Sequence, residues 1–392
     1  MNAIIRTQPI DVRSVEDQFE IATYAKMDIV VERGKGARVW TSDGQEYLDL
    51  YGGHAVCATG HSHPHVVKAI REQAERIIFY SNLVYSDIRA AAAEMLASRT
   101  PAGLDKVFFC NSGTEANENA MRMARMATGR EKIVSFSGGF HGRTADAISA
   151  TFLGHYRELG QPNVPYHADA EFGDIDSARS VIDAETAGVV IEPIQSMAGV
   201  REASPGFFKE LRAHCDVVGA KLIFDEVQTG IGRTGAWFFS GSEAAGGVVP
   251  DMITLAKSLG SGIPVGACVV TPVISGRIGT NDLGTTFGGG MLAMAAVAAT
   301  IEAIEADGMI ENAKAVERFI REKLSGQDRV RSVRGKGCLL GIEFDEPCNS
   351  IHKHLLENGI ITGTSSDPKV LRLLPPLNTP VSDLDLFINR LP

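Results

Sequence analysis

Short apolar strands alternate with helical segments through the middle of the chain. The strands that we predict are KVFFC (106–110), KIVSF (132–136), GVVIEPI (188–194), KLIFDEV (221–227), MITLA (252–256) and GACVV (266–270). Each run is almost continuously apolar, which is typical of a strand buried on both faces of a sheet. Strands of this kind separated by helices predict an α/β fold, in which helices flank a mostly parallel sheet.

The two ends of the chain have a different character. Helical patterns at 291–306, 309–325 and 350–358 are mixed with strand-like stretches at 329–346 and 370–379, and residues 29–50 contain Gly-Lys-Gly and Ser-Asp-Gly turns between short strands. A chain of 392 residues exceeds what one hydrophobic core usually organises. We therefore predict a large domain at 46–290 and a smaller α+β domain formed by 1–45 and 291–392.

Composition excludes several classes of function. The net charge is -10 and no basic stretch is present, which argues against a nucleic-acid partner. The longest apolar stretch, 291–304, is interrupted by Glu302, so no membrane span is expected. The first residues lack the pattern of a signal peptide. The six cysteines are dispersed, with no metal-binding spacing, so we expect no metal site and a reduced, cytoplasmic protein.

Asp225 lies near the end of the predicted strand 221–227, and Lys257 directly follows the predicted strand 252–256. Ligands of open parallel sheets bind beyond the carboxyl ends of the strands, where these two side chains are expected to lie. A lysine amine can condense with the aldehyde of pyridoxal phosphate, and a carboxylate can keep its pyridine nitrogen protonated. For any single Asp/Lys pair, an ordinary salt bridge is the alternative.

Other polar residues follow neighbouring strands. Ser112, Gly113 and Thr114 open a helical pattern after strand 106–110, where free backbone amides form an anion site; a simple helix cap is the alternative. Phe140, just before His141, could stack on a flat ring or belong to the core. Arg143 suits bidentate capture of a carboxylate.

Eight segments, taken in order, resemble one family over nearly the whole chain. The chain is similar to class III (ω-type) aminotransferases of pyridoxal-phosphate fold type I, and within them to the acetylornithine/ornithine aminotransferase group. The segments are YLDLYGGHAVCATGHSHP (47–64), CNSGTEANENAMRMAR (110–125), FHGRT (140–144), EPIQ (192–195), DEVQTGIGRTG (225–235), LAKSLGSGIPVGA (255–267), GTTFGG (284–289) and LRLLPPLN (371–378).

The resemblance implies roles for individual residues. Lys257 is the expected catalytic residue, which binds the cofactor aldehyde and then moves the substrate proton. Thr286 is expected to reach the phosphate of a partner subunit, which implies a homodimer with shared sites. The expected cofactor-binding set is Ser112, Gly113, Thr114, Phe140, His141, Asp225, Gln228, Lys257 and Thr286. Glu192 and Glu226 are as consistent with a structural role as with a role in the site.

Substrate recognition is where the sequence departs from the family. EPIQ is followed by SMAGV, so Met197 stands where the family commonly has a glutamate that pairs with the arginine matched by Arg372. We expect Arg372 to be free for a carboxylate and Met197 to form an apolar wall. His54 either contacts the substrate or is a satisfied structural histidine. The expected substrate-binding residues are Arg143, Arg372, His54 and Met197.

These features predict an aminotransferase. It is expected to move an amino group, at a terminal position, from a donor such as N-acetylornithine or ornithine to a keto acid such as 2-oxoglutarate. An aminomutase, decarboxylase or lyase of the same fold would share Asp225 and Lys257 and is the alternative. A non-catalytic binding protein is disfavoured because the site residues are intact.

Overall fold

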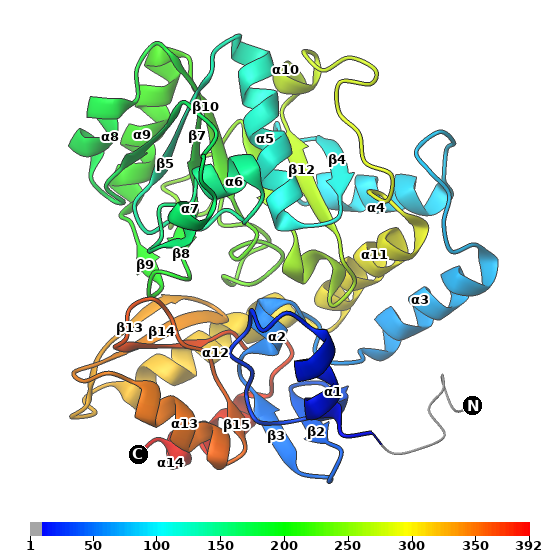
Figure 1. The fold of residues 1–392 in the computed structure, drawn as a ribbon, viewed down its shortest axis with the longest axis vertical. Helices are drawn as coiled ribbons and strands as arrows, with labels where there is room; N and C mark the ends of the chain where they lie inside the picture. Colours follow the sequence, from blue (N-terminus) through cyan, green and yellow to red (C-terminus); the bar gives the residue numbers. More distant parts are fainter. Residues whose placement is uncertain (1–9) are drawn as a thin grey trace.

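A seven-stranded sheet forms the centre of the molecule in the computed structural model, which describes residues 10–392 (Figure 1). Residues 1–9 of the predicted smaller domain and of the N-terminal stretch lie outside the described residues. The strand order is β4-β12-β11-β10-β7-β5-β6, and only β12 runs antiparallel to its neighbours. The strands are β4 (Lys106–Cys110), β5 (Lys132–Phe136), β6 (His167–Ala170), β7 (Thr186–Ile191), β10 (Lys221–Asp225), β11 (Met252–Leu255) and β12 (Gly266–Val270). The predicted α/β fold is confirmed.

Alternate residues of the central strands face two different helix layers. Ile223 packs with the apolar face of α5 (Gly113–Thr128), whereas Leu222 and Phe224 pack with α9 (Pro205–Val218). Both faces of the sheet are therefore buried, which explains the continuous apolar runs in the sequence. The remaining helices of this region are α6 (Ala145–Ser149), α7 (Tyr156–Leu159), α8 (Ile175–Val181) and α10 (Pro272–Ser275).

Two smaller sheets lie beyond the large one (Figure 1). One has the order β1-β2-β3-β15 and the other the order β13-β14-β16, and β15 pairs in parallel with β3. Segments from the two ends of the chain thus share one sheet. The elements are β1 (Val31–Lys35), β2 (Arg38–Thr41), β3 (Glu46–Asp49), α12 (Met309–Leu324), β13 (Val330–Lys336), β14 (Leu339–Phe344), α13 (Asn349–Glu357), β15 (Ile360–Ile361), β16 (Val370–Leu373), η2 (Val381–Asp383) and α14 (Leu384–Arg390).

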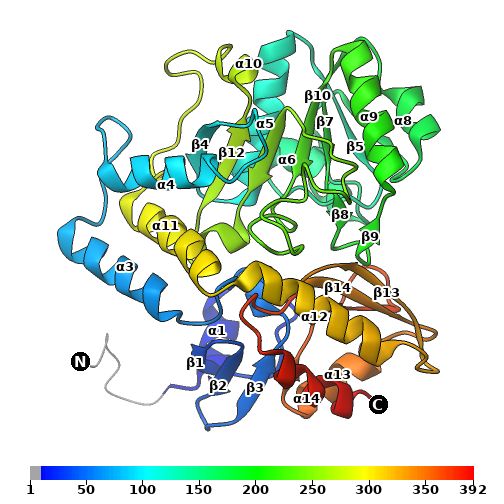
Figure 2. The same ribbon diagram turned by 180° about the vertical axis from the view of Figure 1, so that it is seen from behind.

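Three helices pack together beside the large sheet, as Figure 2 shows. The Ala-rich α11 (Met291–Ala306) packs against α3 (Pro64–Arg76) and α4 (Asp87–Ala97). The division into domains at 46–290 and at 1–45 with 291–392 stays a proposal. Its first boundary falls at the beginning of β3 and its second at the beginning of α11. The other short elements are α1 (Val12–Phe19), α2 (Gly52–Ala55), β8 (Ile194–Gln195), β9 (Arg201–Glu202) and η1 (Lys257–Gly260).

Residues 10–392 contain no helix that is long and apolar enough to cross a membrane. Within the same residues, no group of three or more His, Cys, Asp or Glu side chains could hold a metal ion. All six cysteines are free, and only Cys57 is partly exposed.

Candidate active site

Four adjacent strands of the large sheet, β11, β10, β7 and β5, end at one edge, and a cavity of about 250 Å³ lies beyond them. Lys257 follows β11, Asp225 ends β10, and Glu192 follows β7. Residues far apart in the sequence therefore meet because parallel strands present their carboxyl ends together. The cavity is lined by His54, Gly113, Thr114, Asn117, Phe140, His141, Gly142, Arg143, Glu192, Met197, Asp225, Val227, Gln228, Ala256 and Lys257.

Three hydrogen bonds hold the carboxylate of Asp225. Asn117 Nδ2 and His141 Nδ1 lie 2.7 and 2.8 Å from its Oδ2, and the backbone N–H of Val227 donates to its Oδ1 over 3.1 Å. Asn117 is itself fixed, because its Oδ1 accepts a 2.6 Å bond from Thr254 Oγ1. The side chains of Asp225, Asn117, His141 and Thr254 are all buried. The carboxylate is thus preorganised, and a further polar group in the cavity would meet it in a fixed orientation.

His141 is paired with Asp225 through its Nδ1. Burial alone would lower the pKa of this imidazole, but the hydrogen bond from Nδ1 to Asp225 and the carboxylate's charge outweigh burial and raise the pKa. His141 therefore orients Asp225.

Lys257 is the first residue of η1 and has a positive φ of 41°, which turns the chain sharply after β11. Protein surrounds its amine, and its remaining accessible surface faces the cavity. Burial lowers the pKa of Lys257 to about 8, although Asp225 and Glu192 oppose the shift. The neutral amine is therefore far more accessible near neutral pH than in a solvated lysine.

The two glutamates that the sequence left open differ in the structure. Glu192 lines the cavity, its Oε1 accepts a hydrogen bond from the N–H of Phe140 at 2.8 Å, and burial raises its pKa to about 7. Glu226 instead accepts hydrogen bonds from the backbone N–H groups of Phe239 and Ser240 and from a threonine hydroxyl. Glu226 anchors the turn after β10 and does not line the cavity.

The N-terminus of α5 faces the cavity through Gly113 and Thr114. Ser112 is the N-cap: its Oγ accepts from the N–H of Glu115 at 3.2 Å and donates to the Glu115 carboxylate at 3.1 Å. A Cβ at Gly142 would lie 2.1 Å from Thr114 Oγ1, so the loop after β5 approaches this terminus closely. The helix cap and the residues predicted to form an anion site therefore lie at the same helix terminus.

Gln228 shows that the cavity suits a polar ligand. Its Oε1 and Nε2 are both buried without a hydrogen-bond partner among residues 10–392, as is His141 Nε2. Buried polar atoms of this kind are costly unless something pairs with them. Together with the held carboxylate of Asp225, the buried amine of Lys257 and the helix terminus, they fit the nitrogen, phenolic oxygen, aldehyde and phosphate of pyridoxal phosphate.

Arg143 lies at the exposed rim of the cavity and is held by aromatic rings. Its guanidinium carbon is 5.8 Å from the ring centroid of Phe140 and 5.0 Å from that of Tyr156, and these two rings meet edge to face. No hydrogen bond or ion pair joins Arg143 to another of residues 10–392. Its N–H groups are therefore available to a carboxylate.

Arg372 does not line this cavity. Its guanidinium donates to Thr364 C=O (2.7 Å), Ser196 Oγ (3.1 Å) and Tyr51 Oη (2.9 Å), all of them neutral groups. It is 2% exposed, and no carboxylate of residues 10–392 forms an ion pair with it. The missing glutamate thus leaves Arg372 without an anionic partner, but neutral groups already use three of its donors.

His54 and Met197, the other two residues expected at the substrate, do line the cavity. Burial, followed by the positive charges of Lys257, Arg372 and Arg143, lowers the pKa of His54 to about 3. His54 is therefore a neutral imidazole in the physiological range.

Thr286 lies outside its own chain's cavity and is exposed. Its loop is nevertheless fixed, because the neighbouring Thr285 Oγ1 accepts from Asn111 Nδ2 at 2.9 Å and from the N–H of Gly288 at 3.3 Å. Within one chain, the structure therefore brings Thr286 to the surface and not to the remaining cofactor residues.

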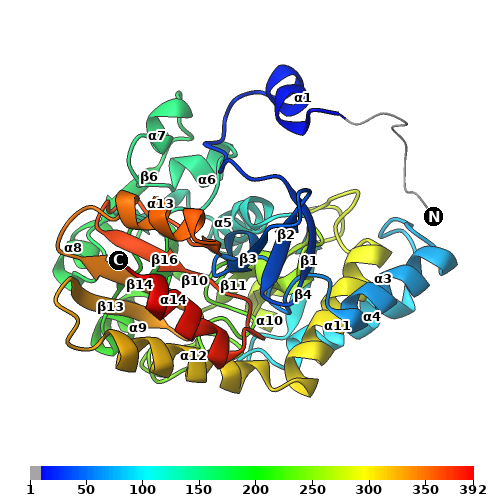
Figure 3. The same cartoon turned by 90° about the horizontal axis from the view of Figure 1, so that it is seen from below.

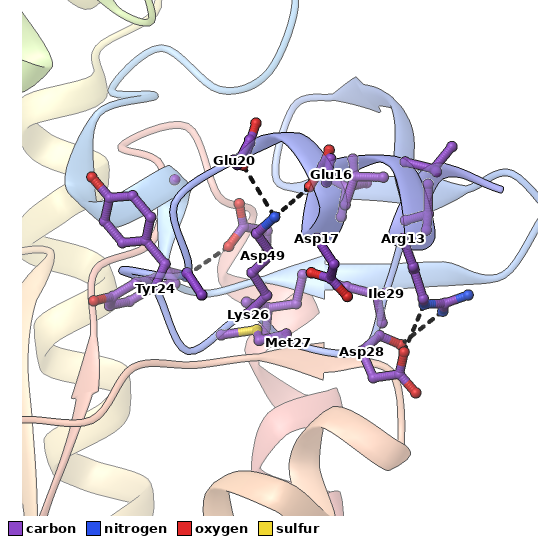
Figure 4. A pocket seen from close by; sticks show the side chains of 18 of the residues that line it. Arg13, Glu16, Asp17, Glu20, Tyr24, Lys26, Met27, Asp28, Ile29 and Asp49 are labelled. Atoms are coloured by element: carbon purple, nitrogen blue, oxygen red, sulfur yellow. Dashed lines mark hydrogen bonds and ion pairs between the residues drawn. The ribbon is translucent and has the colours of Figure 1, made fainter. Parts of the chain in front are cut away.

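A larger cavity of about 830 Å³ lies beneath the N-terminal segment (Figure 4). There Lys26 pairs with Glu16 at 2.8 Å and Glu20 at 3.1 Å, and Arg13 pairs with Asp28 at 2.7 Å. Lys26, the only lysine that lines this cavity among residues 10–392, is thus neutralised by exposed carboxylates. The smaller cavity at the strand ends, which contains a buried amine beside a held carboxylate, is the candidate active site.

Asn117, Val227 and Tyr156 were not among the predicted site residues. Helical periodicity could have identified Asn117, which lies one turn after Gly113 on the same face of α5. Val227 follows Asp225 by two residues in the same turn. No local sequence signal identifies Tyr156, which belongs to a four-residue helix.

Comparison with known proteins agrees with this geometry. The family model described as aminotransferase class-III matches residues 21–392. An acetylornithine aminotransferase of Methanosarcina mazei is 43% identical over 96% of this chain and 94% of its own length. A [LysW]-aminoadipate semialdehyde transaminase of Deinococcus radiodurans is 38% identical over 93% of this chain and 85% of its own. Among solved structures, the ornithine aminotransferase of Toxoplasma gondii matches with a TM-score of 0.89 and 28% identity, covering 97% of this chain and 93% of that one.

Proposed function

Since the chain belongs to the class-III aminotransferase family and is a pyridoxal-phosphate-dependent aminotransferase, we propose that it moves a terminal amino group from a carboxylate-bearing donor to a keto acid. Donors of the N-acetylornithine or ornithine type and 2-oxoglutarate as acceptor are the proposed substrates. They are supported by the relatives' names and by the unpaired guanidinium of Arg143.

We propose the following division of work around the cofactor, which when bound withdraws electrons from the substrate's amine-bearing carbon and acidifies its C–H bond. Lys257 would be the point of attachment, and Asp225, held by His141, would pair with the pyridine nitrogen. Gly113 and Thr114, on the helix that Ser112 caps, would hold the phosphate. Gln228 would donate a hydrogen bond to the phenolic oxygen, and the ring of Phe140 would pack beside the pyridine.

The proposed role of Lys257 in catalysis is proton transfer. Once the substrate amine has replaced it, its Nζ would take the proton from the substrate's amine-bearing carbon and would carry it to the position of reprotonation. A base must be unprotonated to begin this step, and the pKa of about 8 supports that requirement. Arg143 holds the substrate carboxylate at the rim, which orients the terminal amine toward Lys257.

One observation supports the proposal more than any other: a buried lysine and a triply held aspartate occupy neighbouring strand ends below an arginine without an anionic partner. The test is a donor screen with 2-oxoglutarate and pyruvate, in which the aldehyde and amino-acid products are quantified. Terminal amines that carry a carboxylate should react. Reaction with α-amino acids alone, or formation of carbon dioxide or a rearranged amine without a new amino acid, would contradict it.

We also propose a homodimer with shared sites. The segment 77–85 exposes a run of large apolar side chains, among which Leu83 is 90% exposed. This segment adjoins the loop of Thr286, because Phe79 and Phe287 pack with ring centroids 5.2 Å apart and Asn82 donates to Gly288 C=O at 2.8 Å. An apolar patch of this extent supports a protein interface at the Thr286 loop. Sedimentation equilibrium tests it, and a monomer at micromolar concentration would contradict it.

Figure 3 shows that α1 lies apart from the β1-β2-β3-β15 sheet, and none of the residues of α1 is buried. Phe19 at the end of α1 and Ile21 just after it are exposed apolar side chains, which we also assign to subunit contacts. A cytoplasmic location is proposed as well, supported by the six free cysteines, and cell fractionation would test it.

A further inference from the structure

A left-handed turn after β3 presents His54 to the active-site cavity. All four residues of the turn have positive φ: 57° for Gly52, 59° for Gly53, 68° for His54 and 62° for Ala55. Asp49 Oδ1 fixes the start of the turn by accepting from the N–H groups of Tyr51 and Gly52, at 2.9 and 2.8 Å. A histidine held in a conformation that its backbone disfavours indicates that surrounding contacts determine its position.

A chain of hydrogen bonds runs from Arg372 through Tyr51 to His54. Arg372 Nη2 lies 2.9 Å from Tyr51 Oη, which lies 2.6 Å from His54 Nδ1. A guanidinium can only donate, so the phenol oxygen accepts from Arg372. Among residues 10–392 the hydroxyl hydrogen of Tyr51 has no acceptor other than His54 Nδ1, so it is directed there and Nδ1 accepts it. A neutral imidazole whose Nδ1 accepts carries its hydrogen on Nε2.

The surroundings of His54 keep the ring neutral. Burial and the charges of Lys257, Arg372 and Arg143 all disfavour a further cation there. Residues 10–392 offer no acceptor to Nε2, and the ring lines the same cavity as Arg143 and Lys257. The Nε2–H group is therefore a neutral donor on the wall of the substrate cavity.

We infer that His54 is a specificity-determining residue whose Nε2–H donates to an oxygen of the amino donor, and that Tyr51 and Arg372 are positioning residues that fix its tautomer. The inference rests on the proposed function and names its substrate class. The donor carries a carboxylate or an acylamide oxygen near the cavity wall. A diamine whose second group is an ammonium has no acceptor for Nε2–H and would bring a further positive charge beside Arg372 and Arg143.

The tautomer can be measured without any turnover. The holoenzyme is labelled with ¹⁵N-histidine, and the His54 ring is identified by its loss in His54→Gln. Its ¹⁵N shifts should show a protonated Nε2 and an unprotonated Nδ1 from pH 8 down to pH 5.5. Tyr51→Phe should abolish this fixed tautomer. Tyr47→Phe, a matched change on β3 at a buried ring outside the cavity, should leave it unchanged. A protonated Nδ1, or an imidazolium at pH 7, would overturn the inference.

Specificity is measured in parallel. For a terminal amine that carries a carboxylate, His54→Leu should raise KM about tenfold, the usual worth of one hydrogen bond, with kcat nearly unchanged. KM for the straight-chain alkylamine of equal length should not change, and His54→Gln, which restores an N–H donor, should recover most of the loss. Equal effects on both amines would overturn the inference. If no amine reacts, the proposed function fails while the tautomer result stands, so the two failures are distinguishable.

Discussion

The buried amine of Lys257 should make the stability of the cofactor-free protein depend on pH in a defined way. Its pKa falls from 10.5 to about 8 because burial disfavours the ammonium. A lysine with a lowered native pKa contributes stability that is complete above pH 10.5 and is lost as the pH falls to about 8. At 1.36 kcal/mol per pKa unit, the loss is at most about 3 kcal/mol, since water in the cavity reduces it.

The assay compares wild type with Lys257→Met by urea denaturation of cofactor-free protein. Methionine has a similar length and no charge, so its stability lacks this pH dependence. Between pH 10 and pH 8 the wild type should lose roughly 2 kcal/mol relative to Lys257→Met, and below about pH 8 the difference should be constant. Lys106→Met, at an exposed position on β4, corrects for the loss of one positive charge.

A difference between wild type and Lys257→Met that does not change from pH 10 to pH 7 would refute this reasoning. It would mean that the amine is as well solvated in the native protein as in the unfolded chain. The neutral base required for proton transfer would then need another origin.

Three further predictions concern residues around the same site. Asn117→Leu removes a donor to Asp225 and leaves the hydroxyl of Thr254 unpaired, so it should destabilise the protein by about 3 kcal/mol in urea denaturation. It should also weaken cofactor binding in spectroscopic titration, and an unchanged cofactor affinity would contradict the role given to Asn117. Met197→Glu puts a negative charge on the cavity wall and should raise KM for 2-oxoglutarate, which has two carboxylates, about tenfold in steady-state assays. KM for pyruvate, which has one carboxylate, should rise less, and equal changes in the two KM values would count against a charge effect. Thr286→Val should weaken cofactor binding only in the dimer, and a loss of affinity that persists in a monomeric variant would exclude a shared site.

Much of the framework could be predicted from the sequence, for a physical reason. Strands buried on both faces have continuous apolar runs, so β4, β5 and β12 have their predicted bounds. The strand β6 was missed because HADA contains no large apolar residue, and tertiary pairing with β5 makes it a strand. The predicted strand at 221–227 ends at Asp225, since Glu226 turns away to bind backbone amides.

The candidate site was predictable where chemistry depends on residue type and not where it depends on orientation. A lysine and an aspartate at strand ends carry a recognisable chemistry, which led to Lys257 and Asp225. The side chains that position the site residues come from distant segments: Thr254 fixes Asn117, and Tyr51 fixes His54. Such pairings involve no local pattern, so they become visible only when the chain is folded.

The pairing of β3 with β15 fixes the order in which a growing chain can mature. Leu48 lies opposite Ile360, so this sheet closes only after nearly the whole chain has left the ribosome. The seven strands of the large sheet have all been synthesised by Val270, well before that point. During synthesis β1, β2 and β3, with the turn that holds His54, must wait beside a nearly complete sheet for a partner strand. A truncation before Ile360 should therefore leave a folded large sheet beside a β3 strand that pairs with β2 on one side only and has an open, aggregation-prone edge on the other.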